Sequence, residues 1–136
     1  MKQKILVLII AMVALFPWQV KAEENLYHSK NLEEILTEEG IEHDLTGYTE
    51  TEDQAIIYLF RGNGCGYCRN FLTFLNSIVP EYGKYFKVVS YEVWQDASNT
   101  PLLNGFSKSL KVEVEGVPFI IIGNQYFPGY ANVMIE

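Results

Sequence analysis

The stretch Arg61-Gly62-Asn63-Gly64-Cys65-Gly66-Tyr67-Cys68-Arg69 contains both cysteines of the chain, and the sequence on either side of it decides the fold. Before it, Ala55 to Phe60 reads Ala-Ile-Ile-Tyr-Leu-Phe, an apolar and partly β-branched run that predicts a strand buried on both faces. After it, apolar residues recur at helical spacing from Phe71 to Val79, and Pro80 and Gly83 are expected to end or kink that helix. We therefore expect the cysteines in a tight loop between a buried strand and a helix.

Two cysteines three positions apart at the start of a helix can close a small disulfide ring without moving the backbone. The first of them meets the unpaired N–H groups of the helix, whose partial positive charge stabilises a thiolate. This assigns Cys65 as the nucleophile and Cys68, one turn further in, as the resolving thiol. Arg61 and Arg69 flank the pair and are candidates for adding positive charge near the thiolate. Glycines at 62, 64 and 66 keep the approach free for an extended substrate. The predicted active-site loop consists of Gly64, Gly66 and Tyr67.

A structural disulfide and half of a zinc site are the alternatives for this pair. A structural bridge gains stability from the chain that it encloses, and a loop this short encloses almost none. Zinc needs four ligands as a rule, and the other soft candidates, His28 and His43, are isolated without paired spacing. We therefore predict no metal site and no cofactor beyond the Cys65–Cys68 dithiol itself.

The composition predicts a single globular domain. The chain has 136 residues, of which 49% are hydrophobic and 14% aromatic, enough apolar side chain to build a packed core. Its net charge of -7 argues against binding nucleic acid through phosphate neutralisation. The charge is uneven, because residues 23–53 contain eleven acids and one lysine whereas residues 54–136 contain six of each sign. We divide the chain at this shift into an acidic N-terminal segment and a balanced core domain.

The acidic segment, residues 23–53, is expected to form one short amphipathic helix. Asn31, with Glu34 three residues on, resembles a capping box, and Gly40 is a plausible stop. Its charge run is interpreted as a solvated face, with attraction of basic substrate proteins as the alternative. The apolar residues at helical spacing are Leu32, Ile35 and Leu36.

The first 22 residues have the pattern of a secretory signal. Two lysines precede an apolar run from Ile5 to Phe16, and Val20-Lys21-Ala22 forms the expected cleavage site. A retained membrane anchor is the alternative, but twelve apolar residues at about 1.5 Å each fall short of a hydrocarbon core of roughly 30 Å. We expect a mature chain that begins at Glu23 and is secreted or works in the cell envelope, where a stable disulfide is permitted.

Beyond the first helix, the pattern predicts two more strands and a hairpin. Phe86 to Val93 is rich in β-formers and is expected to run parallel to the first strand through a right-handed crossover. Pro101 to Leu110 predicts a second helix. Val117 to Ile122 predicts a third strand, which Gly123-Asn124 turns into an antiparallel fourth strand from Gln125 to Phe127. The expected fold class is α/β, a central mixed sheet flanked by helices.

The dipeptide Val117-Pro118 makes the pattern specific. Pro118 stands fifty residues after Cys68 and opens an apolar strand, where a proline is tolerated at the first positions or in a cis bond. From Ala55 to Tyr130 the sequence resembles the thioredoxin superfamily. The resemblance implies a thioredoxin fold for residues 54–136, with Pro118 cis against the cysteine pair and Val117 pairing with a bound peptide as an added strand. The closing C-terminal helix of that fold has no room in the six residues after Tyr130, so either the sequence is truncated or another element covers that face.

Within the superfamily, the Gly-Tyr dipeptide between the cysteines is similar to that of extracytoplasmic disulfide isomerases of the Dsb type, and a Val before the proline to Dsb oxidases. Arg61 to Phe71 is also similar to thioredoxin-like bacteriocin accessory proteins. The sequence departs from thioredoxins at Leu59, where they carry a buried acid, and at Gly64, where they carry Trp. The resemblance implies a thiol:disulfide oxidoreductase acting on exported proteins with cysteines or disulfides. The favoured direction is oxidation or isomerisation, and the alternative enzyme is a reductase recharged by a membrane redox partner. The alternative is a chaperone or export-accessory module that keeps the fold and binds peptides with little redox turnover.

Overall fold

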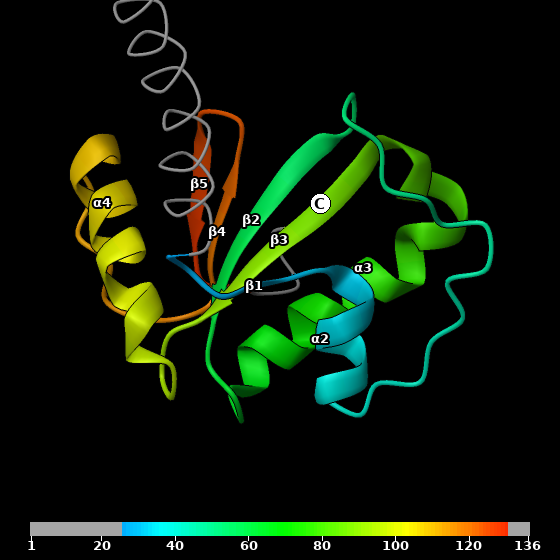
Figure 1. Cartoon of the computed structure of the whole chain (residues 1–136), viewed down its shortest axis with the longest axis horizontal. Coiled ribbons are helices and arrows are strands. Elements are labelled where there is room, and N and C mark those ends of the chain that lie inside the picture. The colour runs from blue at the N-terminus through cyan, green and yellow to red at the C-terminus, as the bar shows by residue number, and fades with distance from the viewer. Residues whose placement is uncertain (1–25, 131–136) are drawn as a thin grey trace, which may run out of the picture.

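The described residues, 26–130, form one mixed sheet with helices on both faces in the computed structural model of the chain (Figure 1). The predicted signal peptide and residues 131–136 lie outside this range. The strands are β1 (Ser29–Lys30), β2 (Ala55–Arg61), β3 (Phe86–Glu92), β4 (Phe119–Ile122) and β5 (Gln125–Pro128). The helices are α2 (Leu32–Glu38), α3 (Gly66–Tyr82) and α4 (Thr100–Leu110), with single 3-10 turns η1 (Gly83–Tyr85) and η2 (Ala97–Asn99). Within residues 26–130, none of the helices combines the length and apolar character needed to cross a membrane.

The strand order is β1-β3-β2-β4-β5, with β2 at the centre. β3 runs parallel to β2, as predicted for two strands joined through a helix, and their register runs from Ala55↔Phe86 to Arg61↔Glu92. β4 pairs antiparallel with β2, and β5 pairs antiparallel with β4. The predicted strand–helix–strand–helix–hairpin order is therefore confirmed.

One strand, β1, was not predicted from the sequence. β1 consists of two residues, Ser29 and Lys30, which pair antiparallel with Tyr91 and Ser90 at the edge of the sheet. Two residues are too few to show the alternation on which strand prediction depends. The acidic segment therefore contributes an edge strand to the sheet as well as the predicted helix.

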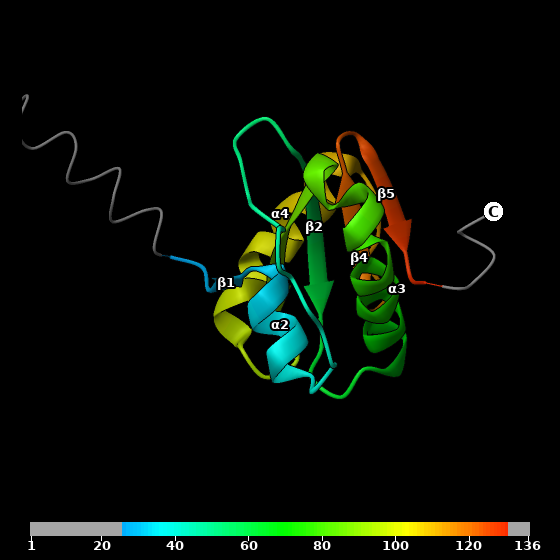
Figure 2. The same cartoon turned by 90° about the vertical axis from the view of Figure 1, so that its right-hand side faces the viewer.

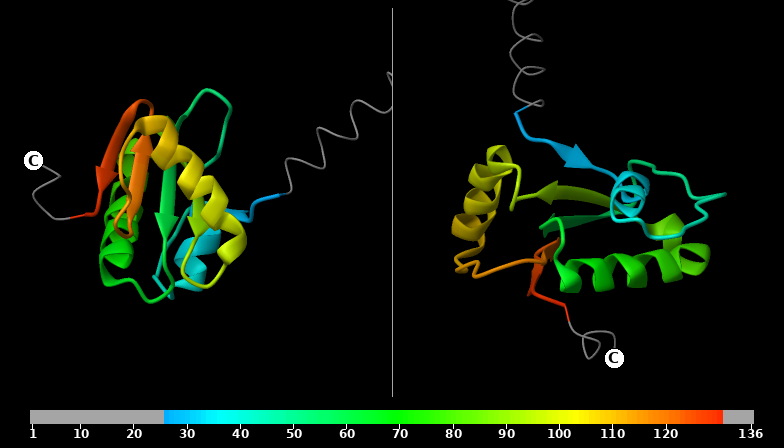
Figure 3. Two further views of the ribbon diagram at one scale, coloured as in Figure 1. Left: turned by 90° about the vertical axis from the view of Figure 1, so that its left-hand side faces the viewer. Right: turned by 90° about the horizontal axis from the view of Figure 1, so that it is seen from below.

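Side chains alternate between the two faces of the sheet, as the pleat of a strand requires. Ile57 and Leu59 of β2 face α2 and α3, whereas Phe60 faces α4. Figure 2 shows α2 and α3 side by side in front of the strands, and Figure 3 shows α4 alone on the opposite side. The strand predicted to be buried on both faces therefore lies in the middle of a three-layer arrangement.

The acidic segment completes the face that carries α3. Leu32, Ile35 and Leu36 of α2 are each 0% exposed and join one hydrophobic core with α3, β2 and β3. The predicted N-cap is present, because the Asn31 side chain accepts a hydrogen bond from the backbone N–H of Glu34 at 2.9 Å. The apolar stripe and the cap of α2 are thus confirmed, and within the described residues α2 and α3 together cover this face.

α3 ends at one of the two residues expected to end or kink it. Pro80 lies inside the helix, which ends at Tyr82 with Gly83 as its C-cap. A proline in the last turn removes one hydrogen bond, the one to the carbonyl four residues earlier, and the helix continues for two more residues before Gly83. The seventeen-residue helix connects the cysteines at one end of the sheet to η1 at the other.

Candidate active site

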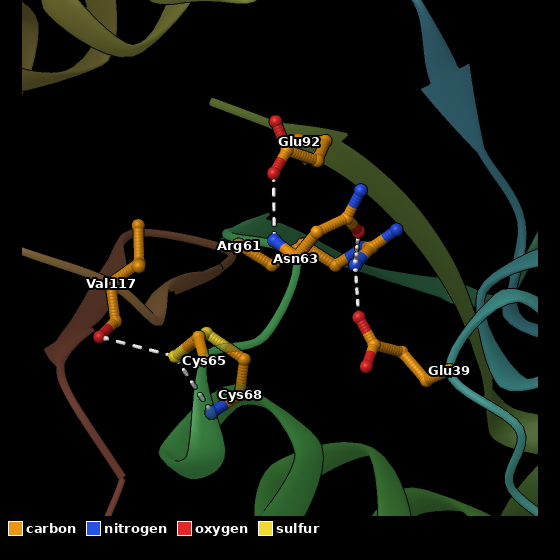
Figure 4. The surroundings of a disulfide bond; sticks show 7 residues. All are labelled: Glu39, Arg61, Asn63, Cys65, Cys68, Glu92 and Val117. Atoms are coloured by element: carbon orange, nitrogen blue, oxygen red, sulfur yellow. Dashed lines mark hydrogen bonds and ion pairs between the residues drawn. A yellow bond between two sulfur atoms is a disulfide. The ribbon is translucent and has the colours of Figure 1, made fainter. Parts of the chain in front are cut away.

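The two cysteines lie where β2 passes into α3, and they form a disulfide (Figure 4). Cys65 is the N-cap residue of α3, and its Sγ accepts a hydrogen bond from the backbone N–H of Cys68 at 3.1 Å. The first turn of α3 contains no acidic residue, so nothing there offsets the partial positive charge of the helix N-terminus. This position favours a sulfur anion, the form that attacks or leaves in thiol–disulfide exchange.

Both cysteines are buried, Cys65 slightly less than Cys68. Cys65 is 6% exposed and Cys68 is 1% exposed, so Cys65 is the more accessible residue of the pair. Gly64 has a φ of +85°, in the left-handed region where glycine is strongly favoured, and it turns the chain into the helix. The space where Gly64 and Gly66 would carry a Cβ is open, and Tyr67 is exposed.

Val117 and Pro118 lie against the disulfide. The peptide bond between them is cis, and the carbonyl oxygen of Val117 lies 3.8 Å from Cys65 Sγ. β4 begins at Phe119, two residues later than the sequence suggested, because Pro118 has no N–H to donate to a ladder. Val117 lies beyond the last paired residues of β4, which leaves its backbone at the rim of the site.

Arg61 points away from the sulfurs and toward α2 (Figure 4). Its Nη2 lies 3.0 Å from Glu38 Oε2, its Nη1 lies 2.8 Å from Glu39 Oε1, and Nη1 also donates to Asn63 Oδ1 at 2.8 Å. The Arg61 side chain is only 1% exposed. A guanidinium that faces two carboxylates adds little net positive charge to its surroundings. Arg61 therefore joins α2 to the active-site loop, which differs from the charge-supplying role expected of it.

Arg69 follows the same pattern from the first turn of α3. Its side chain is exposed and donates a hydrogen bond to the backbone carbonyl of Glu39. In the described part of the chain, the side-chain hydrogen bonds of both arginines go to Glu39, the C-cap of α2, and to Asn63, and none goes to a cysteine sulfur. The two arginines flank the cysteines in sequence, but in space they hold the end of the acidic helix.

Glu92, which sequence reasoning missed, holds the loop before the cysteines. Its carboxylate accepts hydrogen bonds from the backbone N–H groups of Asn63 (2.7 Å), Gln95 (2.6 Å) and Asp96 (3.0 Å). Burial raises the pKa of Glu92, but these bonds and the charge of Arg61 outweigh burial and leave the pKa below its ordinary value. The sequence contained a signal for this contact, because parallel pairing brings the C-terminal ends of β2 and β3 to the same edge of the sheet.

Trp94 was also missed, and it lies against the same loop. A Cβ at position 62 would overlap the indole ring of Trp94, so any other residue there would have to displace that ring. The expectation that Gly62 keeps the approach free is therefore wrong, because Trp94 occupies that space. Trp94 remains 58% exposed.

The histidines and acidic side chains of the described residues are the candidates for the ligands of a metal site. Among residues 26–130, no group of three or more His, Cys, Asp and Glu side chains is arranged to hold a metal ion. His28, to which the sequence assigned no role, lies with its Nδ1 at 2.7 Å from Asp96 Oδ2, and its backbone N–H donates to Asn99 Oδ1. It fastens β1 to the loop after β3.

The predicted fold class is confirmed by this arrangement of elements. The chain has the thioredoxin fold, with a mixed sheet flanked by helices, a C-x-x-C disulfide at a helix N-terminus and a cis-proline loop facing the first cysteine. No protein-family model and no curated protein matches the chain. Among solved structures, Proteus mirabilis ScsC in a transitional conformation is similar, with 14% sequence identity and a TM-score of 0.44. The match covers 98% of this chain and 90% of that chain.

Proposed function

We propose that the chain is a thiol:disulfide oxidoreductase that works outside the cytoplasm on exported proteins with cysteines or disulfides. One observation carries the proposal. Cys65 Sγ is bonded to Cys68 at the N-terminus of α3, accepts the Cys68 N–H, and lies 3.8 Å from the Val117 carbonyl beside a cis-proline. This geometry combines a stabilised leaving group with a backbone edge that can hold a peptide.

In the oxidising direction, a substrate thiolate attacks Cys65 Sγ and breaks the bond to Cys68. Cys68 leaves as a thiolate and takes up a proton, which gives a mixed disulfide between substrate and Cys65. A second substrate thiolate then attacks the substrate sulfur of that bond, and Cys65 leaves as a thiolate at the N-terminus of α3. Two electrons pass from the substrate to the Cys65–Cys68 pair, and the reverse sequence reduces a disulfide.

The backbone of Val117 is suited to hold the substrate during both steps. An extended peptide can add to an exposed backbone edge, where main-chain hydrogen bonds supply affinity and side-chain contacts supply specificity. Val117 is unpaired with either neighbour of β4 and its carbonyl faces Cys65. A peptide that pairs here would present its own cysteine sulfur to Cys65 Sγ.

The proposed location outside the cytoplasm is supported by the signal-like pattern of residues 1–22. An oxidising compartment permits the disulfide to persist between turnovers. The chemistry needs no cofactor, because the dithiol holds both electrons, and a membrane redox partner would restore the starting state after each cycle.

The decisive measurement is the reduction potential of the Cys65–Cys68 pair, obtained by equilibrating the chain with glutathione buffers. A value of about -120 to -180 mV identifies a disulfide donor or isomerase, and a value near about -270 mV identifies a reductase. Cys65→Ser is expected to abolish turnover of a disulfide substrate, whereas Cys68→Ser is expected to accumulate the mixed disulfide. A pair that does not exchange with glutathione, or a Cys65→Ser variant with full biological effect, would show that the chain is a peptide-binding module instead.

A further inference from the structure

The two edges of the sheet differ in how they are protected against pairing with another chain. At one edge, β1 is two residues long and contains Lys30, which pairs with Glu38. At the other edge, β5 (Gln125–Pro128) is four residues long and contains no charged residue. Monomeric proteins protect sheet edges with very short strands, with charged side chains or with proline. β1 has the first two of these features, whereas β5 has only a proline at its end.

The β5 edge belongs to the longest uncharged stretch of the sequence. Residues 117–135 contain no Lys, Arg, Asp or Glu, although these four residue types make up 20% of the chain. Among residues 26–130, β5 is paired with β4 alone, and Figure 2 shows it as the outermost strand on its side of the sheet. The outer side of β5 is therefore open to a further strand within the part of the chain that the structure describes.

The register of the hairpin indicates which backbone groups face outward. Ile122 pairs with Gln125 across the two-residue turn Gly123-Asn124, which places the backbone hydrogen bonds of Gln125 on the side of β4. Because these groups alternate along a strand, Tyr126 directs its N–H and C=O away from β4. Pro128 occupies the next outward position and has no N–H, so pairing stops there. The open edge is therefore short and centred on Tyr126.

The Tyr126 side chain lies on the side of the sheet that α4 covers. It is 41% exposed, and its ring centroid lies 6.1 Å from that of Phe119, which is buried in the smaller core. Aromatic residues directly opposite each other on paired strands stabilise the pairing. The exposed part of the Tyr126 ring can make such a contact with the same residue of a second chain.

We propose that two copies of this chain associate through β5, antiparallel and about a twofold axis at Tyr126, so that their sheets join into one. An antiparallel pair of identical strands is self-complementary, because the N–H of each Tyr126 donates to the C=O of the other. The two tyrosine rings then lie on the same face, with α-carbons about 5.5 Å apart. Because so short an edge makes a small interface, we expect a weak dimer with a dissociation constant of about 10 to 100 μM.

The distribution of charge favours a second copy at this edge. The acidic segment contributes β1 and α2, and β1 lies four strand spacings, about 19 Å, from β5. Surface charges are largely screened beyond a Debye length of about 8 Å at physiological ionic strength. Pairing through β5 leaves the two acidic segments at the outer edges of the joined sheet, so the net charge of -7 opposes it less than it would oppose pairing through β1.

The pairing leaves both disulfides accessible. Pro128, at the end of β5, pairs with Phe119, the residue after the cis-proline. The two copies of β5 run in opposite directions, so the two active sites lie at opposite ends of the joined strands. The association is therefore independent of the proposed redox function.

The test uses the exported chain, which is expected to begin at Glu23, with a reducing agent present so that disulfides between copies do not contribute. Sedimentation velocity measures the association from about tenfold below to about tenfold above the expected dissociation constant. Tyr126→Lys and Tyr126→Glu each place two like charges opposite each other at the axis and are expected to weaken the dimer about tenfold or more. An equimolar mixture of the two variants is expected to restore the dimer, because the substituted side chains then have opposite charges. Recovery in the mixture also shows that both variants are folded.

Ser29→Lys is the matched control, because Ser29 is an exposed residue of the other edge strand, β1. It is expected to leave the dissociation constant unchanged, and Tyr126→Lys is expected to leave turnover of a disulfide substrate unchanged. A chain that stays monomeric over the whole range, a dimer that Tyr126→Lys leaves intact, or a mixture that stays monomeric overturns the proposal. If the chain dimerises only after residues 131–136 are deleted, its own C-terminal segment occupies the edge, and the proposal is equally overturned.

Discussion

The two faces of the sheet receive side chains from the same strands but are packed to different depths. On the face of α2 and α3, fourteen described residues are buried in one core, whereas on the face of α4 only Phe60, Phe119 and Ile121 are. α4 itself has no fully buried residue, although its apolar side chains lie against that face. The difference arises because two helices cover one face and one helix covers the other. We conclude that packing on the α2–α3 face contributes most of the stability. The disulfide lies at the start of α3 and therefore belongs to this face.

The better-packed face also depends on charge. The acidic helix α2 is held at its C-terminal end by Arg61 and Arg69, whose hydrogen bonds go to Glu38 and Glu39. Glu33 and Glu34 at its other end are exposed, as expected for a solvated face. The acidic segment therefore packs as part of the fold next to the cysteines. Removing its charge partners and removing its apolar contacts, in separate variants, shows which of the two contributes more to stability.

The largest effect is expected from Arg61→Ala. The substitution removes a fully buried side chain, leaves a cavity, and takes the cation away from Glu39 and from Glu38, which keeps its pairing with Lys30. The combined cost is expected to be about 3 to 5 kcal/mol. Urea unfolding of the variant measures the loss. Arg69→Ala is the matched control, because Arg69 is exposed and binds only a backbone carbonyl, and its cost is expected to stay below about 1 kcal/mol. Equal losses would show that the carboxylate partners of Arg61 do not make it more important for stability than Arg69.

A pair of leucine substitutions tests the packing directly. Leu72 of α3 is 0% exposed in the larger core, and Leu103 of α4 is half-buried in the smaller one. Leu72→Ala is expected to lower the free energy of unfolding by about 2 to 5 kcal/mol, and Leu103→Ala by roughly 1 kcal/mol, because a half-buried side chain leaves little cavity. If Leu103→Ala costs as much as Leu72→Ala, the two faces contribute equally and the comparison fails.

The sequence was sufficient where the signal is local. The apolar run of β2, the helical spacing of α3, and the place of Val117-Pro118 each depend on a few neighbouring residues, and the structure has these elements where they were predicted to within two residues. The Asn31 cap is of the same kind, since donor and acceptor are three residues apart. The continuous apolar run of β2 also predicted that both faces are covered.

What the sequence missed depends on contacts between distant segments. Arg61 meets Glu39 across 22 residues and Glu92 meets the loop at Asn63 across 29 residues, so nothing near either residue reveals its partner. Trp94 looks like an ordinary apolar residue after a strand until its neighbour Gly62 is known. Arg61 and Arg69 stand beside the cysteines in the sequence and were candidates for thiolate stabilisation. In the structure Arg61 pairs with the carboxylates of Glu38 and Glu39, and Arg69 donates to the backbone carbonyl of Glu39.

The smallest expected effect concerns acid and two carboxylates next to the active-site loop, Glu38 and Glu92. Hydrogen bonds and nearby positive charge leave the pKa values of Glu38 and Glu92 lower in the folded chain than their ordinary values. The largest cause at Glu38 is its hydrogen bond from Lys30; at Glu92, backbone hydrogen bonds overcome the effect of burial. For each of these carboxyls, the unfolded chain binds more protons than the folded chain at pH values between the folded-state pKa and the ordinary pKa. The stability that the two groups contribute is therefore full above about pH 5 and falls as the pH drops further.

Glu92→Gln is expected to make unfolding less dependent on pH in that range, at the cost of some stability at neutral pH, because an amide accepts fewer hydrogen bonds from the loop. Urea unfolding at pH 7 and at pH 4 measures both effects, with Glu115→Gln, an exposed acid, as the control. Hydrogen exchange at pH 4 locates the weakened region. Protection should fall first at the amides of Asn63, Gln95 and Asp96, while the amides of α4 change less. If α4 loses protection first instead, acid weakens the α4 face more than the α2–α3 face. That result would contradict the assignment of the pH-dependent stability to Glu38 and Glu92.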